Sequence, residues 1–270
     1  MLPIFAHPPL GHRSALLAAA LLACLGLPGC LASGVYRTAR TLEKGEGDMN
    51  LTFSAFQIGG AETTTTVNGT KTTTKEPSIT IPNVIPEFAY HIGVTDDLEV
   101  GGRAALGSVL LEIDAKYRFL RSGDLHMALA PALGFRALGP IEGISATLPV
   151  IATYDLNDTL ALNLAPYVGY SSLNSTDKDL SGISGNFLSV GGSAGVQLRG
   201  RTFHFMPSVD ISQTLVTLSD KQSSESSRQR FVIFSLTMGW VSGRELKKLE
   251  NIEDKLDKMD KKLDSGTSPK

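Results

Sequence analysis

Residues 125–137, LHMALAPALGFRA, alternate between large apolar side chains and small or polar ones. Met127, Leu129, Leu133 and Phe135 fall on the apolar side of this alternation. A side-chain period of two over such a length predicts a β-strand with one apolar face. The segment is too long and too apolar for an ordinary strand that faces water. About ten segments of this kind predict an all-β fold, an antiparallel up-and-down transmembrane β-barrel of about ten strands.

The connections between these segments differ in length in a regular way. The expected strands cover about residues 49–59, 85–94, 98–106, 109–120, 125–137, 144–156, 159–171, 187–198, 201–213 and 230–241. Tight turns follow the second, fourth, sixth and eighth strands, whereas long polar loops follow the first, seventh and ninth. This asymmetry is typical of outer-membrane barrels and predicts that both chain ends are periplasmic. We expect the Thr-rich residues 62–78 to form a mobile loop.

Composition and charge argue against nucleic-acid binding and against a membrane helix after the first thirty residues. The chain has 270 residues, with 25 basic and 27 acidic side chains, and no basic run indicates nucleic-acid binding. After the first thirty residues no apolar run reaches the roughly 18 residues that a membrane helix needs. Insertion of the remaining chain into a membrane would therefore require strands.

The first thirty residues predict export. Residues 1–29 contain the apolar run Ser14–Leu27 and are expected to be a signal peptide. The sequence Leu-Pro-Gly-Cys that ends at Cys30 resembles a bacterial lipobox, which implies lipidation of Cys30. The alternative is ordinary cleavage near Ala32. We expect residues 30–48 to form a polar periplasmic lead-in.

The barrel is predicted to extend over residues 49–241, and its two strand faces carry different chemistry. On the outward parity, aromatic residues gather where strands approach the tight turns, as an interfacial girdle requires. The girdle residues are Tyr90, Tyr117, Phe119, Tyr154 and Trp240. On the inward parity lie ionisable residues, namely Glu99, Arg103, Glu112, Asp114, Lys116 and Arg118.

A barrel of ten strands encloses little more than side chains. Opposite charges on adjacent strands would neutralise one another there, because partnerless charges in that space are costly. We therefore expect the inward residues to form a charge network that fills the lumen. The alternative is a narrow selective pore.

Four prolines oppose a regular barrel wall. Pro131, Pro149, Pro166 and Pro207 fall inside expected strands, although proline cannot donate a hydrogen bond to the ladder. Unpaired backbone groups are especially costly in lipid. The sequence therefore predicts bulges or kinks at these positions.

No catalytic or metal-binding constellation stands out. His91, His126 and His204 are isolated from one another, and no serine lies beside them in a recognisable motif. Both cysteines, Cys24 and Cys30, lie in the export region. We expect no catalytic residues, no metal site and no cofactor.

The C-terminal residues 242–270 have a different character from the barrel. They are rich in charged helix formers and carry apolar residues at 3-4-3-4 spacing, which predicts a periplasmic helical tail with a coiled-coil seam. The seam residues are Leu249, Ile252, Leu256, Met259 and Leu263. The helix could lie on the barrel rim or the membrane, or it could mediate self-association or bind a periplasmic partner.

Taken together, Met49 to Val241 resembles the small bacterial outer-membrane β-barrel proteins. Gly239-Trp240 is similar to the aromatic insertion signal of that class, which implies the barrel-assembly machinery and outer-membrane lipid as partners. The resemblance implies a location in the bacterial outer membrane and a structural, anchoring or surface-interaction role without turnover. The alternative is a soluble, lipocalin-like periplasmic lipoprotein that binds an apolar ligand. Such a protein would carry its apolar residues inside and its charges outside.

Overall fold

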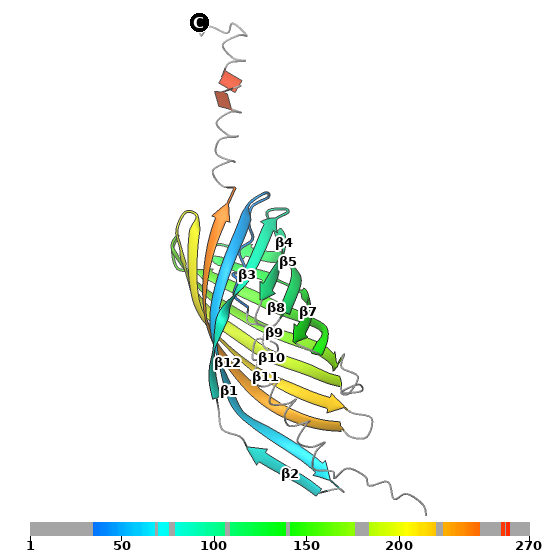
Figure 1. The fold of residues 1–270 in the computed structure, drawn as a ribbon. Coiled ribbons are helices and arrows are strands. Elements are labelled where there is room, and N and C mark those ends of the chain that lie inside the picture. The colour runs from blue at the N-terminus through cyan, green and yellow to red at the C-terminus, as the bar shows by residue number, and fades with distance from the viewer. Residues whose placement is uncertain are drawn as a thin grey trace, which may run out of the picture.

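The computed structural model describes residues 35–67, 70–75, 79–105, 109–138, 141–175, 184–219 and 224–243, together with 255–256 and 258–259. Almost all regular structure in this part of the chain is β-strand (Figure 1). The strands are β1 (Gly47–Val67), β2 (Thr70–Lys75), β3 (Ile79–Gly93), β4 (Leu98–Ala105), β5 (Val109–Ser122), β6 (Leu125–Leu129), β7 (Ala132–Leu138), β8 (Ile141–Asp155), β9 (Leu160–Ser175), β10 (Ser184–Arg199), β11 (Phe203–Ser219) and β12 (Ser224–Ser242).

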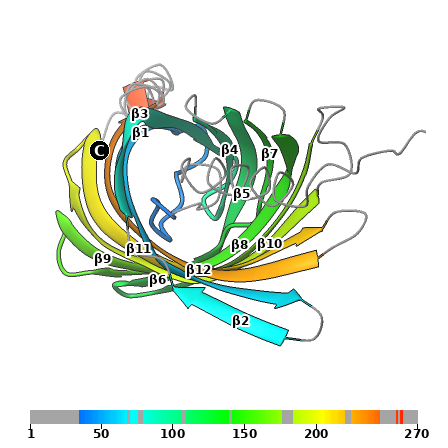
Figure 2. The same ribbon diagram turned by 60° about the horizontal axis from the view of Figure 1, so that its bottom comes forward.

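The strands form a closed antiparallel barrel. Wall neighbours follow one another along the chain, and β12 pairs with β1 to close the circle (Figure 2). Strands β6 and β7 share the neighbours β5 and β8 and together make one wall strand, while β2 pairs only with β1. The wall therefore contains ten strands, which confirms the predicted all-β barrel.

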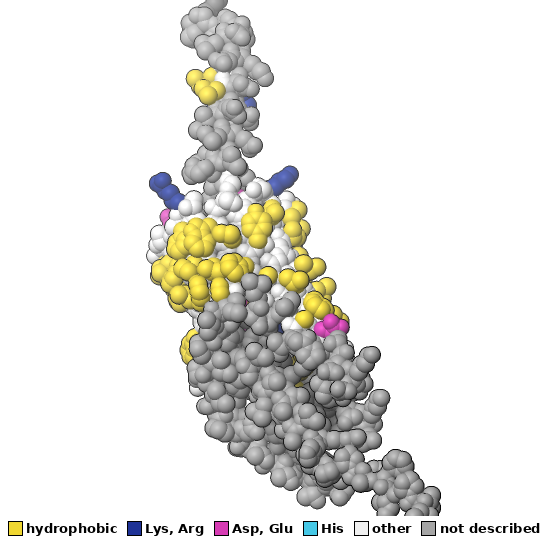
Figure 3. Space-filling view, viewed as in Figure 1, with side chains coloured by type: hydrophobic (Ala, Val, Ile, Leu, Met, Phe, Trp, Pro, Cys, Tyr) yellow, Lys and Arg dark blue, Asp and Glu magenta, His cyan; other side chains and the backbone are white. Residues whose placement is uncertain are grey.

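Side chains on the two faces of the wall have the predicted chemistry. Ile113 and Leu133 point outward, with 69% and 63% of their surface exposed, whereas Glu112 and Lys116 point inward and are 8% and 3% exposed. Figure 3 shows apolar side chains gathered on the upper part of the outer wall. Apolar groups on the outside and ionisable groups within suit a barrel surrounded by lipid, and they are the reverse of an apolar-lined calyx.

The Thr-rich segment differs from its prediction. Residues Glu62–Val67 continue β1 and pair with β2, and Glu62–Thr64 also pair with Arg228–Ser226 of β12. The expectation of a mobile loop was therefore wrong for the described part of this segment. β-branched threonine favours extended backbone, and the neighbouring strand supplies partners for it. Strands β9 to β12 likewise extend further toward the long-loop rim than predicted.

The wall accommodates its prolines through local gaps in the ladder. Residues Ala130 and Pro131 separate β6 from β7, and Pro131 still accepts a hydrogen bond from the Ala115 N–H at 3.1 Å. Around Pro166 the β8–β9 ladder is interrupted and then resumes in the same register. A similar gap lies beside Pro207 in the β10–β11 ladder. The ladder is thus interrupted beside Pro166 and Pro207 without the register shift that a predicted bulge would cause, and the strand order is unchanged.

The residues ahead of β1 enter the barrel. We define the lumen segment as residues 35–46, and Figure 2 shows this dark-blue chain inside the ring of strands. It belongs to the stretch 30–48, for which the sequence predicted a lead-in outside the barrel. Val35 lies inside the barrel. From there the segment runs outward to residue 46, which lies beside the rim that carries the tight turns. We call this rim the tight-turn rim.

Several predictions fall on residues outside the described ranges. These include the signal peptide, Cys30 and the seam residues Leu249, Ile252 and Leu263. Of the tail, the structure assigns helix to 255–256 and 258–259, where Leu256 and Met259 are exposed. The helical tail as a whole stays a prediction. Among the described residues, no helix has both the length and the hydropathy to cross a membrane.

Candidate functional site

A tight turn at the rim fixes where the lumen segment enters the barrel. The Gly45 N–H donates to the Gly93 carbonyl at 2.8 Å, and the Gly93 N–H donates to the Glu46 carbonyl at 2.9 Å. Gly45 has a φ of +80°, which favours glycine. At Gly93, an added Cβ would lie only 2.1 Å from the Glu43 carbonyl oxygen. The turn therefore depends on both glycines.

Side chains of the wall bind the backbone of the lumen segment. Successive contacts come from β4, β5, β8, β9 and β10, so the segment is held from several sides. They are Glu99 Oε2 to the Leu42 N–H (2.9 Å), Lys116 Nζ to the Thr38 carbonyl (2.9 Å), Thr153 Oγ1 to the Ala39 N–H (2.7 Å), Asn163 Nδ2 to the Arg37 carbonyl (2.9 Å) and Ser193 Oγ to the Val35 carbonyl (3.0 Å). Side chains of five wall strands thus hold the backbone of the segment.

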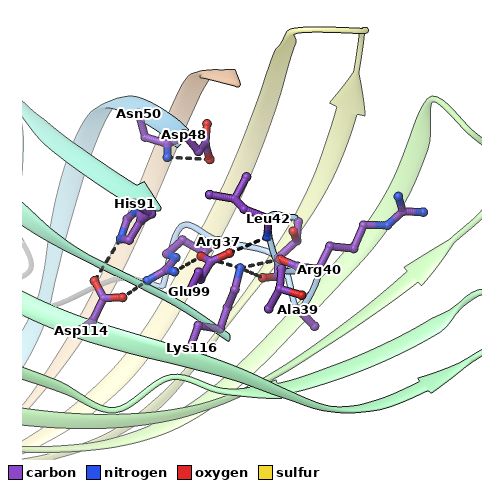
Figure 4. A network of polar contacts seen from close by, with 12 residues as sticks. Arg37, Ala39, Arg40, Leu42, Asp48, Asn50, His91, Glu99, Asp114 and Lys116 are labelled. Carbon is purple, nitrogen blue, oxygen red and sulfur yellow. Dashed lines mark hydrogen bonds and ion pairs between the residues drawn. The ribbon is translucent and has the colours of Figure 1, made fainter. Parts of the chain in front are cut away.

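The Arg37 side chain of the lumen segment pairs with carboxylates on two wall strands. Its guanidinium donates to Glu99 on β4 and to Asp114 on β5 (Figure 4). Glu99 also lies 3.0 Å from the Lys116 ammonium, and the second Asp114 oxygen lies 3.0 Å from His91 Nε2. Two buried carboxylates thus receive two cations and a histidine. A buried pair is tolerated only when its remaining hydrogen-bonding groups are satisfied in this way.

Arg40 makes a second anchor on another part of the wall. Its guanidinium donates to Asp155, with Nε at 3.0 Å. Asp155 also accepts Arg199 Nη2 at 2.8 Å and lies 3.0 Å from His126 Nε2. One carboxylate therefore gathers two guanidinium groups and one imidazole. The lumen segment is tied to β8 here and, through Arg37, to β4 and β5.

Polar groups also pair at the inner end of the lumen segment. Arg103 Nη2 donates to Glu112 at 2.9 Å, and its Nη1 lies 3.4 Å from Glu87. The Arg103 guanidinium lies 5.9 Å from the centre of the Tyr36 ring. A cavity of about 60 Å³ is lined by Tyr36, Glu87, Arg103, Glu112 and others. On its tight-turn side, between the lumen segment and the strands, is an open recess of about 550 Å³.

The inward residues predicted from sequence form three groups in the structure. Glu99, Asp114 and Lys116 meet around Arg37, and Arg103 and Glu112 pair further inside. Arg118 lies apart at the tight-turn rim, where it donates to Asp97 at 2.7 Å. The network is therefore not continuous.

Sequence reasoning missed Arg37, Arg40 and Asp155 as members of this site. The first two belong to a stretch without periodicity, which gives no sign that it lies in a lumen. The available signal was the charge imbalance of the wall itself, whose inward face has more acids than bases. That imbalance calls for cations from elsewhere in the chain.

The predicted girdle residues lie on the outer surface. Tyr90, Tyr117, Phe119, Tyr154 and Trp240 are all exposed there, and Trp240 makes an edge contact with Phe203 at a centroid distance of 5.5 Å. In the described ranges no set of three or more histidine, cysteine or acidic side chains is grouped to hold a metal ion. Two of the three histidine–carboxylate pairs, those at Asp114 and Asp155, are already engaged by arginines of the lumen segment, and the third joins His204 to Asp48 at 3.9 Å.

Comparison with known proteins yields structural likenesses alone. No protein-family model and no curated protein matches the sequence. Similar solved structures include the outer membrane protease OmpT from Escherichia coli, with a TM-score of 0.41, 10% identity and coverage of 76% of this chain and 100% of that one. For the outer membrane protein OprG from Pseudomonas aeruginosa the TM-score is 0.37 and the identity 12%, with coverage of 76% of this chain and 99% of that one. For the Pseudomonas putida toluene transporter TodX the TM-score is 0.34 and the identity 9%, with coverage of 78% of this chain and 95% of that one.

These likenesses are too distant to add to what the strand pairing and the side-chain orientation establish. The wall is closed, so it has no free edge that would leave backbone groups unpaired in lipid. Its outer face is apolar and its ionisable side chains are enclosed. The chain is a closed ten-stranded antiparallel β-barrel with the outer face of a transmembrane barrel.

Proposed function

We propose that this protein is an outer-membrane barrel that its own lumen segment keeps closed, with a structural, anchoring or surface-interaction role and no catalytic turnover. The observation that carries the proposal is the anchoring of Arg37 and Arg40 to carboxylates on β4, β5 and β8. A segment tied to several strands occupies the path that solutes would take along the barrel axis.

The energetics favour a segment that stays seated. Withdrawal would leave Glu99, Asp114 and Asp155 with fewer partners inside the barrel. Removal of one partner from a buried ion pair typically costs about 3–5 kcal/mol. The backbone contacts with Ser193 and Asn163 add further hydrogen bonds that withdrawal would break. Closure is therefore the resting state in this proposal.

The barrel surface supports the proposed role in two places. The hairpin of β1 and β2 projects beyond the remainder of the wall (Figure 1), and in a bacterial outer membrane it would face the exterior if the tight-turn rim faces the periplasm. The outer wall offers its apolar face to lipid. In the same proposal the barrel-assembly machinery inserts the chain, the tail (residues 242–270) extends into the periplasm, and its seam serves self-association or a periplasmic partner.

Conductance in planar lipid bilayers tests closure. The full chain should pass no steady current, whereas a variant with both Arg37→Ala and Arg40→Ala should open because the lumen segment loses its anchors. Arg230→Ala is the matched control, since this arginine is exposed on β12. Silence from the double variant after a normal heat-dependent gel shift would contradict closure by the lumen segment.

A narrow pore is the second candidate function. The open recess of about 550 Å³ beside the lumen segment favours it, because that recess leads inward from the tight-turn rim. Steady current through the unmodified protein would favour the pore over the closed barrel.

A further inference from the structure

We propose that the vacated lumen accepts cations, and that its binding site is the space between Glu99 and Asp114 where the Arg37 guanidinium now lies. This inference rests on the proposed function, because it describes what the barrel binds when the lumen segment leaves. It assigns a ligand class, small cations with a preference for guanidinium and amine groups, to a site that is already built.

The two carboxylates lie close together because of the strand register. Gly101 of β4 pairs with Asp114 of β5, and Glu99 is the next inward position on β4. Both carboxylates are buried, and Arg37 reaches both at once. The guanidinium thus marks a place where two acids from adjacent strands converge on one cation. A planar fork of donors matches such carboxylates better than a spherical ion does.

The absence of a side chain at Gly101 helps to orient Asp114. At Gly101, an added Cβ would lie 2.2 Å from His91 Cδ2. Glycine therefore leaves room for His91 to reach Asp114 at 3.0 Å. One Asp114 oxygen is held by His91 while the other faces the lumen segment. The carboxylate stays directed at the space that a cation would enter.

The charge of the wall favours cations throughout the lumen. Among the described residues, inward acids outnumber inward bases once the rim pair of Arg118 and Asp97 is set aside. The acids are Asp48, Glu87, Glu99, Glu112, Asp114, Asp155 and Asp210, and the bases are Arg103, Lys116, Arg121, Arg136 and Arg199. Arg37 and Arg40 offset much of this excess while the lumen segment is seated. A lumen lined mainly by one sign of charge concentrates ions of the opposite sign.

If Arg37 leaves, wall residues alone pair only partly with Glu99 and Asp114. Lys116 stays 3.0 Å from Glu99 but would lose the Thr38 carbonyl that its ammonium now contacts. Asp114 would lose its guanidinium partner and retain His91. The vacated place therefore contains one partly paired carboxylate and one that lacks a permanent cation. An entering cation would restore the lost contacts.

The test uses the full chain carrying Arg37→Ala and Arg40→Ala in planar bilayers with a KCl gradient. The expected reversal potential indicates a permeability for K⁺ several-fold above that for Cl⁻. Guanidinium chloride, added at concentrations far below those that unfold proteins, should reversibly reduce the K⁺ current. Both effects should weaken several-fold when Asp114→Asn is added. Glu142→Gln is the matched control, because Glu142 is exposed on β8, and it should change neither effect.

The outcomes separate this inference from the proposed function. Current without cation preference, or with preference for Cl⁻, would overturn the cation site and leave closure by the lumen segment intact. Absence of current would count against the closure itself. Glu99→Gln is the second variant at the site, and it should reproduce the loss of guanidinium inhibition if Asp114→Asn fails to fold. Inhibition that persists in both folded variants would also overturn the assignment.

Discussion

At the scale of single residues, the lumen is organised around a few carboxylates that serve several partners. Asp155 is the clearest case, since Arg40, Arg199 and His126 all contact it. Parity in the sequence placed Glu99, Glu112 and Asp114 on the inward face, but it missed Asp155 and did not identify the arginines that pair with these acids. Their partners Arg37 and Arg40 belong to a stretch of sequence without hydrophobic periodicity, so the positions of these two arginines depend on tertiary contacts alone.

Replacement of Asp155 should destabilise the barrel. Asp155→Asn removes the one negative charge that two guanidinium groups share, and we expect a loss of about 3 kcal/mol in the free energy of unfolding. Denaturant titration of the protein in detergent, followed by Trp240 fluorescence, measures this loss. Asp158→Asn, in the exposed turn after β8, should change stability little. Equal effects of the two variants would contradict the role of Asp155.

Gly93 should control the seating of the lumen segment. Gly93→Ala places a Cβ against the Glu43 carbonyl, so the turn must move and the segment should become accessible. Limited trypsin digestion should then cut after Arg37 or Arg40, whereas both sites should resist cleavage in the unmodified protein, where they are paired with carboxylates. Gly192→Ala serves as the control, because its Cβ would have its nearest neighbour at an ordinary 3.5 Å. Cleavage at the same rate in both variants would argue against this role for Gly93.

At the scale of elements, alternation predicted the wall strands well because each of them has one apolar face. The Thr-rich extension was missed for the same reason. Its strands are polar on both sides, so residues 60–75 carry no apolar period and resemble a loop in sequence. Their pairing comes from backbone hydrogen bonds and from the β-branched side chain of threonine. The lumen segment escaped prediction because it is neither strand nor helix.

The hairpin at the far end of β1 should be dispensable for the barrel. Replacement of residues 62–75 by a short turn removes β2 and the outer part of β1, and it leaves the pairing of residues 47–58 with β12 and β3. We expect the heat-dependent gel shift to persist and the stability to change by less than about 1 kcal/mol. A chain that no longer folds would show that the hairpin is needed for the wall.

At the scale of the whole molecule, the protein separates its chemistry by side of the wall. Exposed apolar residues cover the outside, and acids with arginines and lysine occupy the inside. This arrangement follows directly from a period of two, which is why the sequence predicted it. What occupies the lumen depends on a segment that must fold back into the barrel, and no local pattern encodes that return.

A charge on the outer wall should be costly in lipid. Ile113 lies on the outer wall between the aromatic residues Tyr117 and Phe135. We expect Ile113→Arg to lower the folding free energy in lipid vesicles by about 2–4 kcal/mol. Leu156→Arg, beyond Tyr154 in a turn at the rim, should cost about 0–1 kcal/mol. Denaturant titration in vesicles measures both. A cost at position 113 no greater than at 156 would show that the apolar wall does not face acyl chains.

The closing seam between β1 and β12 has a consequence for biogenesis. The lumen segment immediately precedes β1, yet the enclosure around it is incomplete until β12, near the other end of the strand region, pairs with β1. The segment that fills the barrel therefore precedes every wall strand in the chain, and its enclosure is completed only by the last of them.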